Sequence, residues 1–496
     1  MLDFIAIGLG PFNLSLASLL HEKTELNYLF FEKKAQFDWH AGMQLPNTVL
    51  QVPFMADLVS MVDPTSPLSF LNYLKSQQRL YKFYFLEQPH IPRREYNHYC
   101  QWVADQLGHI QYQSTVKAIY AKSEGFEVVV EQGGRFIRYL CRNLVIGSGN
   151  QPYLPECLRK LQQQVPEKCI HSAEYLTHKK SKLKGNVIVL GSGQSSAEVF
   201  LDLFDQQYQH DCVPTADFKL HWLTRSNGFF PMEYAPLGLE HFSPNYTQHF
   251  YRLSETQKAA QLKDQSLLYK GISVKTIREI YQKLYHRSIA SATQATHLHA
   301  QIQLLDAELL ESQQIRLSLE HTVTEQRFYM DVDFVVASTG YYSPEFPFLK
   351  YLKPLIATDQ MGRWKVSQDY RLQHSAMGEI FVQNQEMHSH GVGTPDLGLG
   401  AYRAATIINQ LAERQIYELG QQVQTFQHFN LSQNPKICMA DKKAVSEDCL
   451  CEKTASKNLS ILKTAEQNTI TTSSTSRGAG TRTQTAAVYS TYEKLI

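Results

Sequence analysis

Two glycine-rich turns in this chain could each hold the pyrophosphate of a dinucleotide. The first is Gly8-Leu9-Gly10-Pro11-Phe12-Asn13, and the second is Gly191-Ser192-Gly193-Gln194-Ser195-Ser196-Ala197. Glycine lets the backbone approach a pyrophosphate, and the helix that follows presents free N–H groups and the positive end of its dipole to the phosphates. One turn of this kind is a weak signal, because it can also be a plain strand-to-helix connection. Two turns in one chain predict two dinucleotide sites.

The residues that end the neighbouring strands differ in charge. Glu32 ends the strand after the first turn, about 20 positions past the glycines, where a carboxylate can accept hydrogen bonds from ribose hydroxyls. Arg225 follows the strand after the second turn, and a guanidinium can bind a 2′-phosphate through two parallel hydrogen bonds. We therefore expect FAD at the first turn and NADPH at the second. The alternative for Arg225 is an ordinary surface arginine.

A βαβ unit must position each turn. Around the first turn the pattern predicts strands at residues 3–7 and Leu26–Phe31 and an amphipathic helix at Leu14–His21. Around the second it predicts strands at Asn186–Leu190 and Lys219–Leu223, with the helix beginning over Glu198–Phe204.

Other segments complete an α/β architecture with two Rossmann-like dinucleotide-binding domains and a small, mainly helical substrate domain. Leu144–Gly149 and Asp333–Tyr341 are strands that run into glycine and connect the two domains, and Val274–His286 has a helical period. We expect an FAD-binding domain at residues 1–160 with 341–430 and an NADPH-binding domain at residues 161–225 with 301–340. A helical substrate-binding insertion is expected at residues 226–300, and a largely disordered tail at residues 431–496.

Charge and hydropathy exclude several classes of partner. The 48 Lys and Arg residues balance 47 Asp and Glu residues, so there is no electrostatic case for a nucleic acid or an anionic membrane. The mean hydropathy is −0.33 and no apolar run is long enough for a transmembrane span. The eight cysteines lack a C-x-x-C pair, which favours a cytoplasmic location, predicts no metal site and argues against a disulfide reductase.

Further motifs make the two glycine turns specific. They are Phe37-Asp38-Trp39-His40, Leu50-Gln51, Asp57-Leu58-Val59, Asp63-Pro64-Thr65-Ser66-Pro67, Ser69-Phe70-Leu71-Asn72-Tyr73-Leu74, Gly193-Gln194-Ser195-Ser196-Ala197-Glu198, Ala337-Ser338-Thr339-Gly340-Tyr341 and His390-Gly391. In this order, over about residues 1–420, the chain resembles the flavin-dependent N-hydroxylating monooxygenases of siderophore biosynthesis, the lysine/ornithine N-hydroxylase family.

The resemblance implies FAD, NADPH, O2 and a primary amine that attacks a flavin hydroperoxide and becomes a hydroxylamine. It also implies a homo-oligomer, a tetramer or dimer. Gln51 matches the glutamine beside the flavin ring and is the one residue expected to act in catalysis. The other cofactor-binding residues that it implies are Gly8, Gly10, Pro11, Asn13, Glu32, Trp39, His40, Gly191, Gly193, Gln194, Ser195, Arg225, Thr339, Gly340, Tyr341, Asp396 and Leu397.

One departure from the family pattern concerns the substrate. Relatives that act on lysine or ornithine have a lysine five positions after the Gln51 equivalent, where its ammonium pairs with the substrate carboxylate. This chain has Ala56 there, and an unpaired buried carboxylate would cost several kcal/mol. We therefore expect a diamine such as putrescine or cadaverine, with L-lysine or L-ornithine as the alternative and another amine such as histamine as a third.

Either substrate needs a counter-charge at its far end. The expected partners of the remote ammonium of a diamine are Asp57, Glu233 or Asp396, and the sequence does not choose among them. If an amino acid is the substrate instead, Lys75, Arg93 or Lys270 could take over its carboxylate.

Overall fold

The first glycine turn lies at the head of a seven-stranded sheet in the computed structural model. The structure describes residues 1–21, 23–178, 183–208, 217–289, 295–420 and 425–430; the predicted tail, 431–496, lies outside them. The strand order is β3-β2-β1-β6-β5-β4, and β17 pairs with β6. These strands are β1 (Leu2–Ile7), β2 (Tyr28–Phe31), β3 (Ile110–Gln111), β4 (Ser114–Lys122), β5 (Gly125–Gln132), β6 (Arg135–Ile146) and β17 (Ile380–Val382).

The strands β1 and β2 are parallel and consist almost wholly of apolar residues, as expected where both faces of a sheet are covered. The helices of this part are α1 (Pro11–Leu20), α2 (Phe70–Ser76), α3 (Leu80–Leu86), α4 (Arg93–Ala104) and α12 (Gly400–Leu411). Helix α1 packs on α12 and α4 and buries most of its side chains. It begins at Pro11, three residues earlier than predicted, because Gly10 ends the extended chain and proline suits the first helical position.

The second glycine turn lies at the head of a five-stranded parallel sheet with the order β11-β10-β9-β15-β8. Its strands are β8 (Cys169–His171), β9 (Gly185–Leu190), β10 (Phe218–Leu223), β11 (Thr296–His299) and β15 (Phe334–Ala337). Helices α6 (Gln194–Gln207) and α10 (Val274–Ser288) pack on one face. Helix α5 (Glu156–Gln164) and an antiparallel sheet of β12 (Ile302–Leu309), β13 (Ile315–His321) and β14 (Arg327–Val332) pack on the other.

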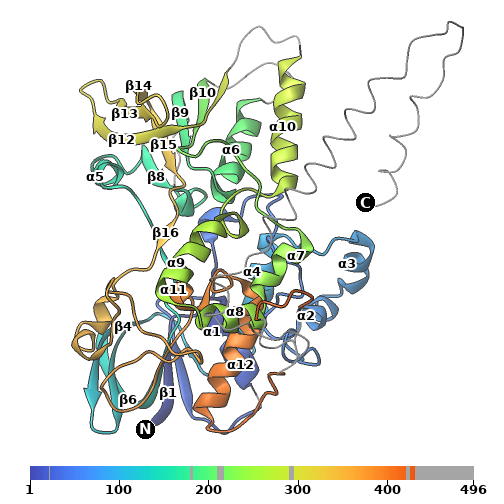
Figure 1. The fold of residues 1–496 in the computed structure, drawn as a ribbon, viewed down its shortest axis with the longest axis vertical. Helices are drawn as coiled ribbons and strands as arrows, with labels where there is room; N and C mark the ends of the chain where they lie inside the picture. Colours follow the sequence, from blue (N-terminus) through green and yellow to red (C-terminus); the bar gives the residue numbers. More distant parts are fainter. Residues whose placement is uncertain (22, 179–182, 209–216, 290–294, 421–424, 431–496) are drawn as a thin grey trace, which may run out of the picture. The chain divides into compact units, whose positions relative to one another are not determined.

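The segment predicted as a helical insertion contains α7 (Pro236–Leu239), α8 (Pro244–Tyr251), α9 (Glu255–Asp264) and α10. Helices α8 and α9 contact α11 (Met387–His390), whereas α10 contacts α6 of the second sheet. Figure 1 shows α8 and α9 between the two sheets. The segment ends in strand β11, so its last residues belong to the second sheet rather than to a helix. A two-stranded pair, β7 (Gln151–Pro152) with β16 (Tyr341–Tyr342), connects the two halves.

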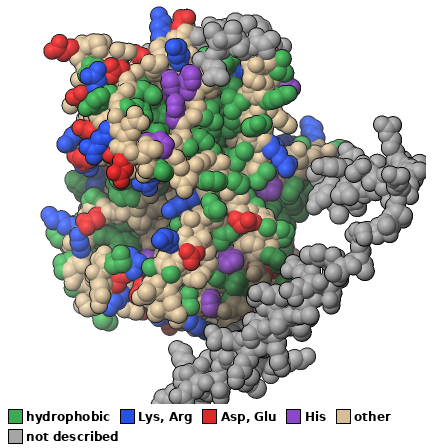
Figure 2. Space-filling view, turned by 45° about the horizontal axis from the view of Figure 1, so that its top comes forward, with side chains coloured by type: hydrophobic (Ala, Val, Ile, Leu, Met, Phe, Trp, Pro, Cys, Tyr) green, Lys and Arg blue, Asp and Glu red, His purple; other side chains and the backbone are tan. Residues whose placement is uncertain are grey.

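The surface carries both signs of charge. On the face shown in Figure 2, Lys and Arg side chains are interspersed with Asp and Glu side chains. In the part of the chain that the structure describes, no helix has the length and apolar character that a membrane span requires.

Candidate active site

One cavity of about 3190 Å³ opens on both glycine turns. Most of the predicted site residues line it: Gly8, Gly10, Pro11, Glu32, Trp39, His40, Gln51, Ala56, Gly191, Gly193, Gln194, Ser195, Arg225, Thr339, Gly340, Tyr341, Asp396 and Leu397. Three do not line it, namely Asn13, Asp57 and Glu233. The structure therefore brings together residues from five distant stretches of the chain.

The first turn has the geometry that a diphosphate requires. Gly8 has φ +84°, and a Cβ there would lie 2.8 Å from the carbonyl oxygen of Gly147, so no other residue fits without a shift. Gly10 is the N-cap of α1 and supplies no capping side chain. A Cβ on Gly10 would meet nothing within 4 Å, which leaves an open cradle in front of the first N–H groups of the helix.

The second turn repeats this geometry. Gly191 has φ +135°, and a Cβ there would lie 2.4 Å from the carbonyl oxygen of Ser338. Gly193 caps α6 without a side chain and faces open space, as Gly10 does. Both turns thus fit the pyrophosphate of a dinucleotide, and both open on the same cavity.

The two charged residues that end the strands have different surroundings. Glu32 is buried, and its carboxylate accepts the N–H of Leu9 at 2.7 Å and the N–H of Lys34 at 2.9 Å. It therefore holds the first turn against strand β2 while it lines the cavity. Arg225 is exposed, and within the described ranges its guanidinium makes no ion pair, so its five N–H donors face solvent.

Asn13 lies behind the first turn rather than in the cavity. Its Nδ2 donates to the carbonyl of Gly8 at 2.6 Å, and its Oδ1 accepts from Nε2 of Gln383 at 2.6 Å. The side chain is fully buried. These contacts hold the backbone of the first glycine turn in place from the side away from the cavity.

His40 lies on the cavity wall in the left-handed backbone region, with φ 54°. The side chain of His40 is exposed to the cavity, and partial desolvation, with the charges of Arg93 and Lys34, lowers the pKa of its imidazole below the ordinary value. The ring contacts Trp39 at 4.3 Å and Tyr341 at 6.4 Å between centroids. These ring contacts join the segment after strand β2 to the β15–β16 connection.

Sequence reasoning missed the role of Glu198, which follows the second turn on α6. This buried carboxylate accepts two hydrogen bonds from Arg93, at 2.8 and 2.9 Å, and a third from Nε2 of Gln194 at 3.0 Å. Gln194 also accepts the N–H of Ser273, so its amide is engaged in holding the turn. The signal in the sequence was a single acid within the apolar run Ala197–Phe200, which required a buried partner.

The three carboxylates predicted for the remote ammonium are now distinguished. Asp57 is buried and accepts the N–H groups of Val59, Ser60 and Phe70, so its oxygens are already engaged. Glu233 is exposed and caps the N–H of Ala235 at 2.6 Å. Asp396 alone of the three lines the cavity.

Asp396 and Ala56 both lie beside Gly398. Oδ1 of Asp396 accepts the N–H of Gly398 at 2.7 Å, and a Cβ on Gly398 would lie 2.8 Å from this oxygen and 3.9 Å from the Cβ of Ala56. Among the described residues its Oδ2 accepts no hydrogen bond and the carboxylate has no ion pair. Burial raises the pKa of Asp396 to about 6 despite the hydrogen bond from Gly398.

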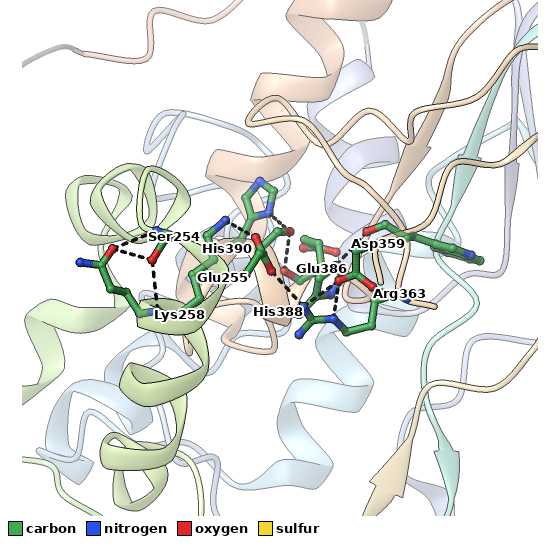
Figure 3. A network of polar contacts seen from close by, with 11 residues as sticks. Ser254, Glu255, Lys258, Asp359, Arg363, Glu386, His388 and His390 are labelled. Atoms are coloured by element: carbon green, nitrogen blue, oxygen red, sulfur yellow. Dashed lines mark hydrogen bonds and ion pairs between the residues drawn. The ribbon is translucent and has the colours of Figure 1, made fainter. Parts of the chain in front are cut away.

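A network of polar contacts ties the helical segment to the first-sheet half of the cavity (Figure 3). Glu255 at the start of α9 pairs with Arg363 at 2.9 Å and with Lys258 at 3.1 Å, and Arg363 also pairs with Asp359 at 2.7 Å. Arg363 lines the cavity. These contacts hold α9 against Arg363, which is part of the cavity wall.

The histidines of α11 are engaged by backbone carbonyls. His388 lies 2.8 Å from the carbonyl of Trp364, and His390 lies 3.3 Å from that of Gln368. Burial lowers the pKa of both rings, that of His390 to about 3. Within the described ranges no three metal-ligating side chains converge on one point.

Two glycine turns, each at the head of a set of parallel strands and both opening on one cavity, define an oxidoreductase fold with two dinucleotide sites. The chain belongs to the L-lysine 6-monooxygenase/L-ornithine 5-monooxygenase family, whose model matches residues 1–343.

Curated relatives match along most of their length. The rhizobactin siderophore biosynthesis protein RhbE of Rhizobium meliloti (strain 1021) is 42% identical over 86% of this chain and 95% of its own. The putrescine N-hydroxylase of Shewanella oneidensis is 37% identical over 87% of this chain and 85% of its own.

Solved structures share the fold. The FAD-bound cadaverine monooxygenase of the desferrioxamine pathway of Erwinia amylovora superposes with a TM-score of 0.80, at 35% identity, over 86% of this chain and 98% of that one. The ornithine N-hydroxylase of Kutzneria sp. 744, solved with reduced FAD, NADP+ and L-ornithine, gives a TM-score of 0.77 at 27% identity, over 83% and 99%.

Proposed function

We propose that this chain is an FAD- and NADPH-dependent monooxygenase that hydroxylates one amine of an aliphatic diamine, putrescine or cadaverine, for a hydroxamate siderophore. The single observation that carries the choice of substrate is the pair formed by Ala56 and Asp396 on the cavity wall. A methyl group stands where an amino-acid hydroxylase has its lysine, and a carboxylate without an ion pair lies beside it. The similarity to enzymes named for putrescine and cadaverine supports the same substrate class.

Bound FAD and NADPH supply the reducing equivalents and the activation of O2. The first turn, with Glu32, holds FAD, and the second turn, with Arg225, holds NADPH. Gln51 lines the same cavity as the first turn and Ala56, and its side-chain amide would orient groups beside a bound flavin ring. We assign catalytic positioning to this glutamine.

The amine that reacts must be neutral. With a reference pKa near 10.4, deprotonation at pH 7 costs about 4.6 kcal/mol. The lining of the cavity includes the apolar side chains of Met55, Met61, Leu239 and Phe242, and apolar surroundings disfavour an ammonium ion.

The distal amine of the diamine stays charged and needs an anion. Asp396 supplies it, because it lines the cavity, its Oδ2 accepts no hydrogen bond from the described residues, and burial raises its pKa. Binding of an ammonium ion relieves the cost of keeping this carboxylate ionised. On this proposal the cavity favours the neutral form of the reacting amine and the charged form of the distal amine.

L-lysine or L-ornithine is the second candidate substrate. It is supported by one of the three cations that could pair with its carboxylate. Arg93 is already paired with Glu198, and Lys75 is exposed and does not line the cavity. Lys270 does line the cavity, with its ammonium 5.1 Å from the ring of Tyr269. Replacement of Lys270 by Met would abolish turnover of an amino acid if this lysine clamps the carboxylate.

The test is hydroxylamine formation by the FAD-loaded protein with NADPH and O2, with putrescine, cadaverine, L-lysine and L-ornithine compared at equal concentration. Product from the diamines supports the proposal. Product from the amino acids alone would refute the role of Ala56 and leave the flavin chemistry standing. NADPH oxidation without hydroxylamine from any of the four would refute the amine substrate class.

We further propose that the enzyme is a cytoplasmic homo-oligomer, a dimer or tetramer. Helix α3 buries none of its side chains and exposes Tyr81, Tyr84 and Phe85, each by more than 70%, which is typical of a contact surface. The cysteines Cys100, Cys141, Cys157 and Cys169 are free, as in a reducing compartment. Light scattering of the protein and of Phe85→Glu tests the assembly, which the variant should weaken.

A further inference from the structure

We propose that Arg93 and Glu198 are positioning residues that hold the second glycine turn at a fixed distance from the wall formed by His40–Met43. On the proposed function, the pair thereby sets the approach of NADPH to the flavin. It joins α4, in the first-sheet half, to α6, which begins at the second turn.

The geometry of the pair is that of a fixed spacer. Nη1 of Arg93 lies 2.9 Å from Oε2 of Glu198, and Nη2 lies 2.8 Å from Oε1, so the two planar groups meet through parallel hydrogen bonds. The side chains are only 11% and 4% exposed. A bidentate contact fixes distance and orientation together, which a single hydrogen bond does not.

Each end of the pair is anchored to a cavity wall. The backbone N–H of Arg93 donates to the carbonyl of Thr48 at 3.0 Å, and its guanidinium also donates to the carbonyl of Met43. Met43 ends the short helix after His40. Arg93 therefore ties the wall that carries His40 to the carboxylate of α6.

The other end reaches the turn itself. Glu198 lies one helical turn after Gln194, and its Oε1 accepts from Nε2 of Gln194 at 3.0 Å. The amide of Gln194 also contacts the start of α10. Its Oε1 accepts the N–H of Ser273 at 2.8 Å, and its Nε2 donates to the hydroxyl of Thr276 at 3.1 Å. Arg93 and Gln194 line the cavity, so the pair lies in the wall between the two turns.

A second contact shows that the two halves meet closely at this place. A Cβ on Gly42 would lie 1.8 Å from the carbonyl oxygen of Ala173, and the N–H of Leu176 donates to the carbonyl of Gly42 at 3.0 Å. Buried ion pairs contribute little net stability, so a well-packed apolar pair could hold the halves together equally well. The ion pair instead fixes the position of one half of the protein relative to the other. A reaction between two bound groups depends on that position, since a misplacement of the groups by about 1 Å can lower the rate about 100-fold.

The test is Glu198→Asp, which keeps the buried charge and shortens the side chain by one methylene. We measure the rate of flavin reduction by saturating NADPH under anaerobic conditions, the KM for NADPH, and hydroxylamine formed per NADPH oxidised. The expected result is a rate at least 10-fold lower and fewer hydroxylamines per NADPH, with the KM within threefold and the FAD content unchanged. A rate within twofold of the wild type would overturn the proposal.

A readout on the protein without cofactors separates positioning from chemistry. In Glu198→Asp, amide hydrogen exchange should accelerate together in residues 40–48 and in the first turn of α6. The matched control is Asp331→Glu, which alters the bidentate pair of Asp331 with Arg316 at 2.8 and 2.9 Å, on β13 and β14. This control should change neither the reduction rate nor exchange at the two segments.

If Glu198→Asp does not retain FAD, Arg93→Lys decides by the same criteria, since lysine keeps the charge but cannot form the bidentate contact. Failure of the proposed function would be distinct, because the wild-type protein itself would then not be reduced by NADPH.

Discussion

The cavity keeps Asp396 in surroundings that disfavour its charge, and this predicts that removal of the charge stabilises the enzyme without substrate. We consider Asp396→Asn, which preserves the shape of the side chain and leaves an oxygen to accept the N–H of Gly398. Burial raises the pKa of Asp396 from 3.8 to about 6. At pH 7 the folded wild-type protein therefore holds an ionised carboxylate that the unfolded chain holds more easily.

The magnitude follows from the linkage between proton binding and folding. Each tenfold change in proton affinity corresponds to 1.36 kcal/mol, so a rise from 3.8 to about 6 costs the folded state up to about 3 kcal/mol above pH 6. Because the folded state binds the proton more tightly, this contribution to stability is fully present below pH 3.8 and is lost as the pH rises through about 6. Asp396→Asn does not titrate, so its advantage should grow over that interval and then stay constant.

The assay is the thermal midpoint of the FAD-loaded proteins between pH 4.5 and 8, without substrate. With an unfolding entropy of about 2.1 cal/mol/K per residue, about 3 kcal/mol shifts the Tm of a chain of this size by about 3 °C. Asp396→Asn should therefore melt about 3 °C above the wild type at pH 8 and only about 1 °C above it at pH 4.5. Putrescine should raise the Tm of the wild type and not that of the variant.

Two results would refute this reasoning. A Tm difference that is the same at pH 4.5 and pH 8 would mean that the charge of Asp396 is not the cause. A wild type more stable than the variant at pH 8 without substrate would mean that a cation inside the protein already neutralises the carboxylate. Glu233→Gln removes an exposed carboxylate outside the cavity and is the matched control, with no expected pH dependence.

Three further substitutions separate the parts of the site. Ala56→Lys places an ammonium ion beside Asp396, so we expect the KM for putrescine to rise at least 10-fold and turnover of L-ornithine to appear, both measured as hydroxylamine formation. Arg225→Ala should raise the KM for NADPH about 10- to 100-fold and leave that for NADH within about twofold, since hydrogen bonds to a charged phosphate contribute about 1.5–3 kcal/mol; an equal effect on both coenzymes would contradict the 2′-phosphate role. Glu32→Gln keeps the N–H of Leu9 satisfied but loses the charge near the ribose, so the dissociation constant for FAD should rise about 10-fold in fluorescence titration, and an unchanged constant would contradict that role.

Local patterns in the sequence were enough to predict both glycine turns. The conformation of Gly8 and Gly191 is dictated by close backbone neighbours, and the helices begin directly after the second glycine of each motif. Such features depend on a few consecutive residues, so periodicity and glycine spacing reveal them. The turns, their strands and the charged residues at the strand ends were predictable for this reason.

Long-range pairing was not predictable in the same way. Arg93 and Glu198 are 105 residues apart, and nothing local shows that they meet. Asp57 was a plausible substrate ligand until its contact with the N–H of Phe70, 13 residues away, showed that its oxygens cap the backbone. Strand β11 was missed because Thr296–His299 lies at the edge of its sheet and has little apolar character.

The choice of substrate class is then a matter of charge at one place in the cavity. An amino acid presents a carboxylate at the end remote from the reacting amine, and a lysine at the position of Ala56 would neutralise it. A diamine presents an ammonium ion at the same end, and the combination of a methyl group at Ala56 with the open carboxylate of Asp396 matches that charge. The arrangement also disfavours an amino acid, because its carboxylate would face Asp396 with no cation between them. On the proposed function, the diamine regains on binding the free energy that the buried carboxylate costs the free enzyme, so this one residue predicts both a preference for diamines and a rejection of amino acids.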